Sequence, residues 1–233
     1  MYYPLPYKKY AMNVGTNVQP VCGNLLPSLL TTQQTDMRYR LYTLLLAVLL
    51  GVLACSGPSS THPHVLIQTK FGDIEAELYP AQAPKSVAAF LSYVDSGFYR
   101  NTLFYRVLND VNQPSNASKA ELIQGGMWRT NYKKSKALPG IPHETTEQTK
   151  ILHTDGTLSL AREAPGTASS EFFICIDDQP GLNYGGENNP DGQGYAAFGK
   201  VVKGMDVVKR IHRQPDDDQS FNPPVYIFNI RRK

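Results

Sequence analysis

Three short segments carry an arginine, a glutamine and a phenylalanine whose chemical properties complement one another. Arg106 lies in Asn-Thr-Leu-Phe-Tyr-Arg-Val, Gln124 in Leu-Ile-Gln-Gly-Gly, and Phe173 in Ser-Glu-Phe-Phe-Ile. A guanidinium stays charged and presents several donors in a fixed plane. A glutamine amide can accept from it and fix its aim, while a phenylalanine ring offers an apolar surface. Such a set suits a site that binds an apolar group and stabilises a lone pair that develops beside it.

Other reactive patterns are missing from the sequence. The five histidines have no ligand spacing with the cysteines or with one another, so we expect no metal site. Residues 188–192 lack the spaced ligands and terminal glutamate of an EF-hand loop, and the three aspartates at 216–218 suit a solvated turn. Ser169 and Ser170 have no nucleophile-elbow context. The net charge of +3 comes without a basic stripe, so we expect no nucleic-acid partner.

Short apolar or alternating runs predict many β-strands. The clearest is 74–79, where apolar residues alternate with Glu75 and Glu77, as in the half-buried strand of a hairpin. Eight such runs follow one another along the chain: 64–69, 74–79, 103–108, 122–124, 157–161, 172–176, 196–202 and 225–230.

Two helices are predicted among these strands. Residues 83–97 carry Pro84 near their start, an apolar i, i+3, i+4, i+7 stripe, and Gly97 at their end. Residues 204–211 form a second, shorter helix. Many short strands, glycine-rich joints and only two helices favour a mainly β fold, a closed antiparallel barrel or a sandwich, over alternating βα units.

Residues 37–54 have the layout of a secretory signal peptide. Two arginines precede an apolar run that starts at Leu41 and ends in small residues. This run is too short to cross a bilayer of ~30 Å, which needs roughly 20 residues. Val-Leu-Ala-Cys resembles a bacterial lipobox and predicts lipidation of Cys55. We therefore expect a lipid-anchored protein of the bacterial cell envelope, facing the periplasm or the cell exterior. A plain secreted protein, an uncleaved anchor and a buried core helix are the alternatives.

The segments around this signal complete the domain organisation. Residues 1–36 show no apolar period of either kind. We expect that translation starts at Met37 and that 1–36 are a start-site misassignment, or are disordered if they are made. Residues 55–63 are polar and contain proline, as in a short tether. Residues 64–233 are long enough for one domain with a proper core.

From about His64 to Lys233, the order of motifs resembles the cyclophilin family of peptidyl-prolyl cis-trans isomerases. These motifs are Phe-aromatic-Arg, Ile-Gln-Gly-Gly, Gly-Thr-Leu-Ser-Leu-Ala, Glu-Phe-Phe-Ile and Ala-Phe-Gly-Lys-Val, at near-family spacing. The resemblance implies a closed eight-stranded antiparallel barrel capped by two α-helices, with the active groove on its outer face. It also implies catalysed rotation of X–Pro bonds in proline-containing polypeptides, without a cofactor. We expect a monomer.

The resemblance also implies roles for individual residues. Arg106 matches the catalytic arginine and Gln124 its partner glutamine, while Phe173 matches the floor of the proline pocket. Arg162 matches a position whose backbone holds the peptide. The full set of matched substrate-binding positions is Tyr105, Leu122, Ala161, Arg162, Phe173, Leu182 and Tyr195.

Several residues depart from the family pattern. Tyr105 replaces the histidine of the usual Phe-His-Arg, and Glu171 replaces the glutamine before the phenylalanine pair. Gly181 stands where many members carry a tryptophan, and Tyr195 falls where a histidine is common. Glu121 occupies the place of a pocket phenylalanine, unless a shifted register points it to solvent.

Two functions follow from the sequence. The motifs and the signal together predict a peptidyl-prolyl isomerase that acts on exported proteins during folding. The alternative is a non-catalytic chaperone or adaptor, in which Tyr105, Glu121 and Gly181 have converted the groove to peptide binding alone. Binding without accelerated cis-trans exchange would favour the alternative.

Overall fold

The computed structural model describes Arg40, Tyr42 and residues 62–116 and 118–233. The chain divides into two compact units, Met1–Ser59 and Ser60–Lys233. In the first unit the two described residues are helical and exposed. The second unit contains the strands, the remaining helices and the core.

The predictions for residues 1–36, for the signal peptide at 37–54 and for lipidation of Cys55 lie outside the described residues, as does most of the 55–63 tether. Within the part of the chain that the structure describes, no helix combines the length and apolarity needed to span a bilayer. The first strand begins at His64.

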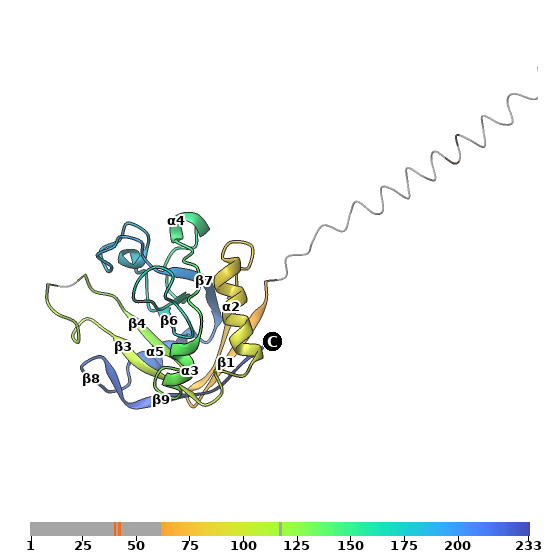
Figure 1. The fold of residues 1–233 in the computed structure, drawn as a ribbon. Coiled ribbons are helices and arrows are strands. Elements are labelled where there is room, and N and C mark those ends of the chain that lie inside the picture. The colour runs from red at the N-terminus through yellow and green to blue at the C-terminus, as the bar shows by residue number, and fades with distance from the viewer. Residues whose placement is uncertain (1–39, 41, 43–61, 117) are drawn as a thin grey trace, which may run out of the picture. The chain divides into compact units, whose positions relative to one another are not determined.

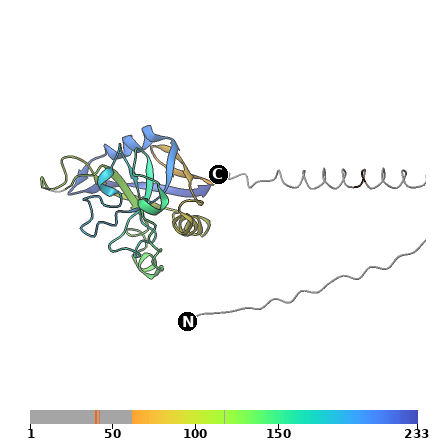
Figure 2. The same cartoon turned by 90° about the horizontal axis from the view of Figure 1, so that it is seen from above.

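In the described residues, eight strands form one closed antiparallel barrel (Figures 1 and 2). The first strand, β1 (His64–Thr69), pairs with both β2 and β9, and this second pairing closes the ring. The order around the barrel is β1-β2-β7-β5-β6-β4-β3-β9, and the two-residue β8 extends it beyond β9. The fold predicted from the sequence is confirmed. The remaining bounds are β2 (Gly72–Leu78), β3 (Thr102–Leu108), β4 (Leu122–Gly126), β5 (Thr157–Leu160), β6 (Phe172–Cys175), β7 (Ala196–Lys203), β8 (Asp216–Asp217) and β9 (Ser220–Arg232).

The two predicted helices are present, and the described residues add two short ones. Helix α2 packs against β7 and β9, and α5 packs against β2 and β4. The additional helices were missed because six and four residues are too few to show an apolar period, and local caps start them instead. Asn131 accepts from a backbone N–H at the start of α3, and Thr145 forms a capping box at the start of α4. The helices are α2 (Pro84–Asp95), α3 (Tyr132–Ala137), α4 (Thr146–Thr149) and α5 (Met205–His212), with a 3₁₀ turn at Pro180–Leu182.

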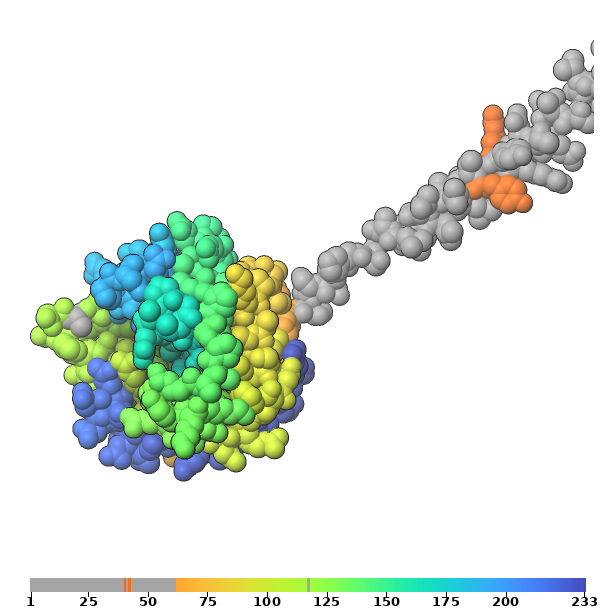
Figure 3. Space-filling model, viewed as in Figure 1, coloured from red at the N-terminus to blue at the C-terminus, as the bar shows by residue number. Residues whose placement is uncertain are grey.

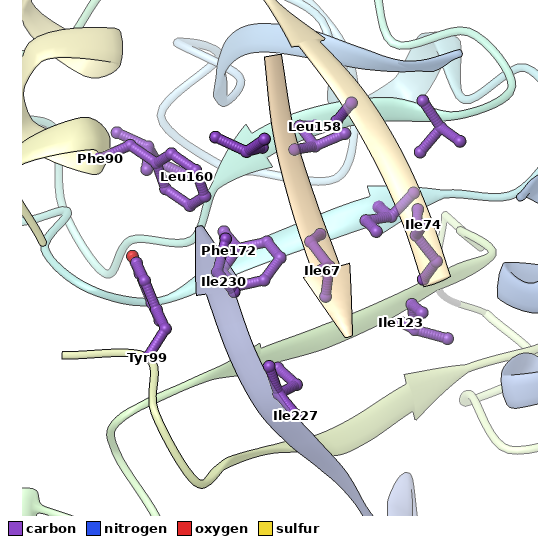
Figure 4. Packing of buried hydrophobic residues seen from close by; sticks show 14 of the residues in the cluster. Ile67, Ile74, Phe90, Tyr99, Ile123, Leu158, Leu160, Phe172, Ile227 and Ile230 are labelled. Carbon is purple, nitrogen blue, oxygen red and sulfur yellow. The ribbon is translucent and has the colours of Figure 1, made fainter. Parts of the chain in front are cut away.

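Alternation along the strands separates an inner core from an outer apolar cluster. Phe172 of β6 lies inside the barrel, with ring centroids 5.5 Å from Phe90 of α2 and 5.6 Å from Tyr99 (Figure 4). The next residue, Phe173, belongs to a separate buried cluster on the outer side, together with Leu122. Because side chains fill the interior, as in other small barrels, a ligand has to bind outside.

A β-bulge in β3 places two consecutive side chains on the outer face. The pairing with β4 passes from Phe104 directly to Arg106, so Tyr105 is the extra residue of the bulge. Phe104 and Val107 are fully buried in the core, whereas Tyr105 and Arg106 are half-buried. Strict alternation would have turned one of these two inward.

The start of α2 is capped by a residue far away in the sequence. Ala83 offers no side-chain hydrogen bond, and Pro84 occupies the first turn. The buried carboxylate of Glu144 accepts from the backbone N–H groups of Lys85 (3.1 Å) and Ser86 (2.8 Å), and from Ser86 Oγ (2.7 Å). A carboxylate at this position satisfies free donors and interacts favourably with the helix dipole.

Replacing Glu144 with alanine leaves these donors, two of them buried on Ser86, without an acceptor. We expect Glu144→Ala to lower the free energy of unfolding by about 1–3 kcal/mol. Urea unfolding followed by circular dichroism measures the change. The control, Glu147→Ala, alters an exposed residue of α4 and should stay within about 0.5 kcal/mol of the wild type. A Glu144→Ala variant of wild-type stability would show that this cap contributes nothing.

Candidate active site

A cavity of about 280 Å³ opens on the outer face of the barrel. All the predicted site residues of the domain except Tyr105 line it, so the structure brings together positions that lie far apart in the sequence. The predicted residues in the cavity wall are Arg106, Leu122, Gln124, Ala161, Arg162, Phe173, Leu182 and Tyr195.

The floor of this cavity is apolar and tightly held. Phe173 is 2% exposed and packs in one cluster with Leu122 and Leu182. The ring of His153 stacks on the ring of Phe173, with centroids 5.9 Å apart, and Tyr195 meets it edge-on at 5.3 Å. Contacts on two sides hold the ring in place, which suits a site for a small apolar ring.

The guanidinium of Arg106 is held between two amide oxygens. Its NH1 donates to Gln124 Oε1 (3.2 Å), while its Nε and NH2 donate to Gln219 Oε1 (3.2 and 2.7 Å). Gln219 in turn donates to the backbone oxygen of Asn112 (3.2 Å). Because a guanidinium carries five N–H donors, others are left for a ligand in the cavity.

Gln219 is a residue of the site that sequence reasoning missed. It lies in the turn between β8 and β9, where Asp218 and Gln219 have φ angles of 44° and 67°. Its backbone oxygen accepts from the N–H of Val107 (2.9 Å), which fixes the turn beside β3. The aspartates before it predict a turn, but nothing local shows that the turn faces Arg106.

A second cavity of about 590 Å³ adjoins the first and contains Tyr105. The two cavities share Gln124, Ala161 and Arg162. The second cavity lies between the segment that follows β4 and the loop at 161–169. These two segments lie side by side in Figure 3, in green and teal, and are joined by an isolated β-bridge near their ends.

The comparisons with known proteins agree with this geometry. A family model described as "Cyclophilin type peptidyl-prolyl cis-trans isomerase/CLD" matches residues 64–232. The chain belongs to this family. Its enzyme class is peptidyl-prolyl cis-trans isomerase.

Curated relatives and solved structures show the extent of the similarity. A peptidyl-prolyl cis-trans isomerase of Acinetobacter baylyi is 36% identical over 193 residues, covering 80% of this chain and 94% of the relative. Peptidyl-prolyl cis-trans isomerase B of Escherichia coli is 38% identical over 148 residues, covering 63% and 82%. A crystal structure of a cyclophilin-type isomerase from Cryptosporidium parvum is 25% identical with a TM-score of 0.58, covering 74% of this chain and 98% of that one.

Two departures from the cyclophilin pattern have a physical explanation. Glu121 does not line the cavity, because its neighbours Ala120 and Leu122 face the groove and Glu121 points the other way, 4.0 Å from His212. A Cβ at Gly181 would collide with Oδ1 of Asn188. Asn188 lies in the loop at 183–195, between the 3₁₀ turn and β7, so this loop fills the space that a tryptophan would need.

The side chain of Arg162 supports this same loop in the cyclophilin groove. It donates to both carboxylate oxygens of Asp191 (2.6 and 2.9 Å) and to the backbone oxygen of Gly194 (2.9 Å). Arg162 lowers the pKa of Asp191 to about 2. Since the guanidinium is engaged with the loop, the backbone of Arg162 is the part that can face a ligand.

His153 supports the floor from behind. Its Nδ1 lies 2.9 Å from Oδ1 of Asn183, and its Nε2 lies 2.9 Å from Oγ of Ser159. With a neutral ring, Nδ1–H donates to Asn183 and Nε2 accepts from Ser159. Burial lowers the pKa of His153 to about 4.

This lowered pKa predicts a pH dependence of stability. Between pH 6.5 and 4 the unfolded chain binds a proton at His153 that the folded chain does not, so stability falls as the pH is lowered through this window. Between pH 7.5 and 4.5 we expect His153 to account for a loss of roughly 2–3 kcal/mol. Urea unfolding at pH 7.5 and 4.5 measures it.

The matched variant is His153→Gln, which keeps a donor and an acceptor but cannot titrate. It should lose less stability than the wild type between the two pH values, whereas His143→Gln, at a half-buried histidine elsewhere, should lose as much as the wild type. Equal losses in all three proteins would exclude His153 as the cause.

Proposed function

We propose that Arg106 is the catalytic group that accelerates rotation about X–Pro bonds bound in the 280 Å³ cavity. The observation that carries the proposal is the clamp on its guanidinium by Gln124 and Gln219, beside a floor made by Phe173. A donor that is already aimed loses little by reorganising when the reaction occurs.

The chemistry of the X–Pro bond explains why an arginine suffices. The amide bond has partial double-bond character, with a rotation barrier of ~18–20 kcal/mol. Twisting it makes the prolyl nitrogen pyramidal and gives it a lone pair that the planar ground state lacks. A guanidinium aimed at that nitrogen binds the twisted state better than either planar state, which is the condition for catalysis. One such contact supplies roughly 3–4 kcal/mol, or about 10² to 10³ in rate.

The other residues hold the substrate while the bond turns. Phe173, Leu122 and Leu182 form an apolar pocket for the proline ring. Ala161 and the backbone of Arg162 lie along the same groove and hold the flanking peptide. The crystal structure of the Cryptosporidium parvum isomerase in the presence of the dipeptide Ala-Pro supports this substrate class, at 26% identity and a TM-score of 0.56 over 72% of this chain and 97% of that one.

We further propose that the protein acts on exported polypeptides during their folding, as a monomer anchored through a lipid on Cys55. The support is the sequence at 37–55, with its basic start, apolar run and lipobox. Relatives from two bacteria, Acinetobacter baylyi and Escherichia coli, agree with a bacterial source.

Arg106→Ala tests the catalytic role. We expect the isomerisation rate of a short Ala-Pro peptide to fall about 10² to 10³-fold in the full-length protein, measured by NMR exchange spectroscopy. Arg106→Lys keeps the charge without the planar fork and should recover only a small part of the rate. Arg213→Ala, at an exposed arginine of the chain, is the control and should keep wild-type activity.

An Arg106→Ala variant with unchanged exchange would exclude this role. If the wild-type protein shifts the peptide signals without accelerating exchange, the groove is a binding module instead.

Cys55→Ser tests the anchor. In bacterial cells that express the full-length protein, we expect the wild type in the membrane fraction and Cys55→Ser in the soluble fraction. Loss of one lipidation site removes the apolar chains that hold the protein on the bilayer. Ser59→Ala, in the predicted tether, is the control and should stay with the membrane. Continued membrane association of Cys55→Ser would contradict the anchor.

A further inference from the structure

A chain of hydrogen bonds leads from Arg106 to a buried carboxylate. NH1 of Arg106 donates to Oε1 of Gln124 (3.2 Å), and Nε2 of Gln124 donates to the hydroxyl oxygen of Tyr105 (3.0 Å). The Tyr105 hydroxyl donates to Oε2 of Glu171 (2.8 Å). The bulge in β3 makes this possible, because it puts Tyr105 and Arg106 on the same outer face within reach of one glutamine.

Glu171 determines which group donates and which accepts in each of these hydrogen bonds. Its Oε1 accepts from the backbone N–H of Trp128 (3.0 Å) and from Oγ of Ser170 (2.9 Å). An ionised carboxylate can only accept, so the Tyr105 hydroxyl has to point its proton at Oε2. The hydroxyl oxygen is then free to accept, and Gln124 has to offer its NH₂ group. The amide oxygen of Gln124 is left facing the guanidinium.

The residues around Tyr105 and Glu171 favour the hydrogen bond between them. Gly126 has a φ of 146°, and a Cβ at that position would collide with the Glu171 carboxylate. Burial raises the pKa of the Tyr105 hydroxyl, which keeps its proton available for donation. Burial also raises the pKa of Glu171 above its usual 4.5, although the hydrogen bonds from Tyr105 and Ser170 oppose the shift.

We propose that Tyr105 and Glu171 are positioning residues that fix the orientation of the Gln124 amide and, through it, the aim of Arg106. The proposal rests on the proposed function, in which Arg106 is the catalytic group. It gives one explanation for two departures from the family pattern, since the tyrosine at 105 and the glutamate at 171 are in direct contact.

The variant Glu171→Gln keeps the shape of the side chain but reverses the donors and acceptors in this series of hydrogen bonds. The fixed N–H of Trp128 holds the new amide oxygen, so the NH₂ group faces Tyr105 and donates to it. The tyrosine proton then points at Gln124, whose amide turns its NH₂ towards the guanidinium and loses the bond to Arg106. Tyr105→Phe breaks the same chain by removing the hydroxyl.

The experiment measures exchange of an Ala-Pro peptide by NMR on the full-length protein. We expect each single variant to lower the catalytic rate constant about tenfold, as for loss of a charge-assisted hydrogen bond. Peptide affinity should be unchanged, because neither residue lines the 280 Å³ cavity.

The double variant should be no slower than the slower single variant, since both substitutions break the same series of hydrogen bonds. The Nε–Hε signal of Arg106 should shift in all three. Glu147→Gln, at an exposed glutamate of α4, is the control.

A pH profile separates positioning from a merely structural role. A protonated Glu171 donates to Tyr105 as the glutamine does, so the wild-type rate should fall as the pH drops through the raised pKa of Glu171. This fall should be absent from Glu171→Gln and present in Glu163→Gln. The titratable and charged groups that surround Glu171 or line its cavity are Tyr99, Tyr105, Arg129, Lys136, Arg162 and Glu163.

The outcomes distinguish this proposal from the one that it rests on. If Arg106→Ala abolishes acceleration while Glu171→Gln and Tyr105→Phe keep the wild-type rate, the positioning role is wrong and the catalytic arginine stands. Rate losses that multiply in the double variant would also overturn it. If Arg106→Ala has no effect, the proposed function itself fails.

Discussion

Closure of the barrel is the constraint on which the rest of the structure depends. Because β1 pairs with both β2 and β9, the sheet has an inside, and apolar side chains such as Phe172, Phe90 and Ile67 fill it (Figure 4). Nothing can bind there. A ligand therefore has to lie against residues that alternate with the core, and Phe173, next to Phe172, forms the floor of the outer groove that we propose binds substrate.

The bulge in β3 modifies that alternation at one point, and the proposed chemistry depends on it. A regular strand would expose either Tyr105 or Arg106. The extra residue exposes both, so the guanidinium lies in the 280 Å³ cavity while its neighbour reaches a carboxylate in the next cavity. Bulges next to active sites commonly redirect a side chain in this way. Here one bulge connects a half-buried cation to a buried anion through Gln124.

The sequence was sufficient for most of the fold because its signals are local. Alternation at 74–79 and the apolar stripe at 83–97 each reflect a period that a strand or a helix imposes. The groove residues followed from motif order, and the structure gathers them at one cavity. Their catalytic and binding roles, like lipidation of Cys55, stay predictions.

What the sequence could not show are contacts between distant segments. Glu144 caps α2 from 58 residues away, and Gln219 reaches Arg106 across 113 residues. The spacing of apolar residues along the sequence gives no information about contacts between such distant residues. The bulge at Tyr105 was also invisible, because an extra residue in a strand leaves the apolar composition of that strand unchanged.

The last strand, β9, both closes the barrel and holds the turn that carries Gln219. Strand β9 supplies the pairings with both β1 and β3, and Gln219 immediately precedes it. Until these C-terminal residues are in place, the sheet has two open edges, which can pair with other chains. The turn that carries Gln219 joins β8 to β9, so without β9 it loses the strand pairing that holds this half of the Arg106 clamp. A chain that stops short of β9 would therefore keep two unpaired strand edges and would lack part of the contact that, in the proposed mechanism, aims Arg106.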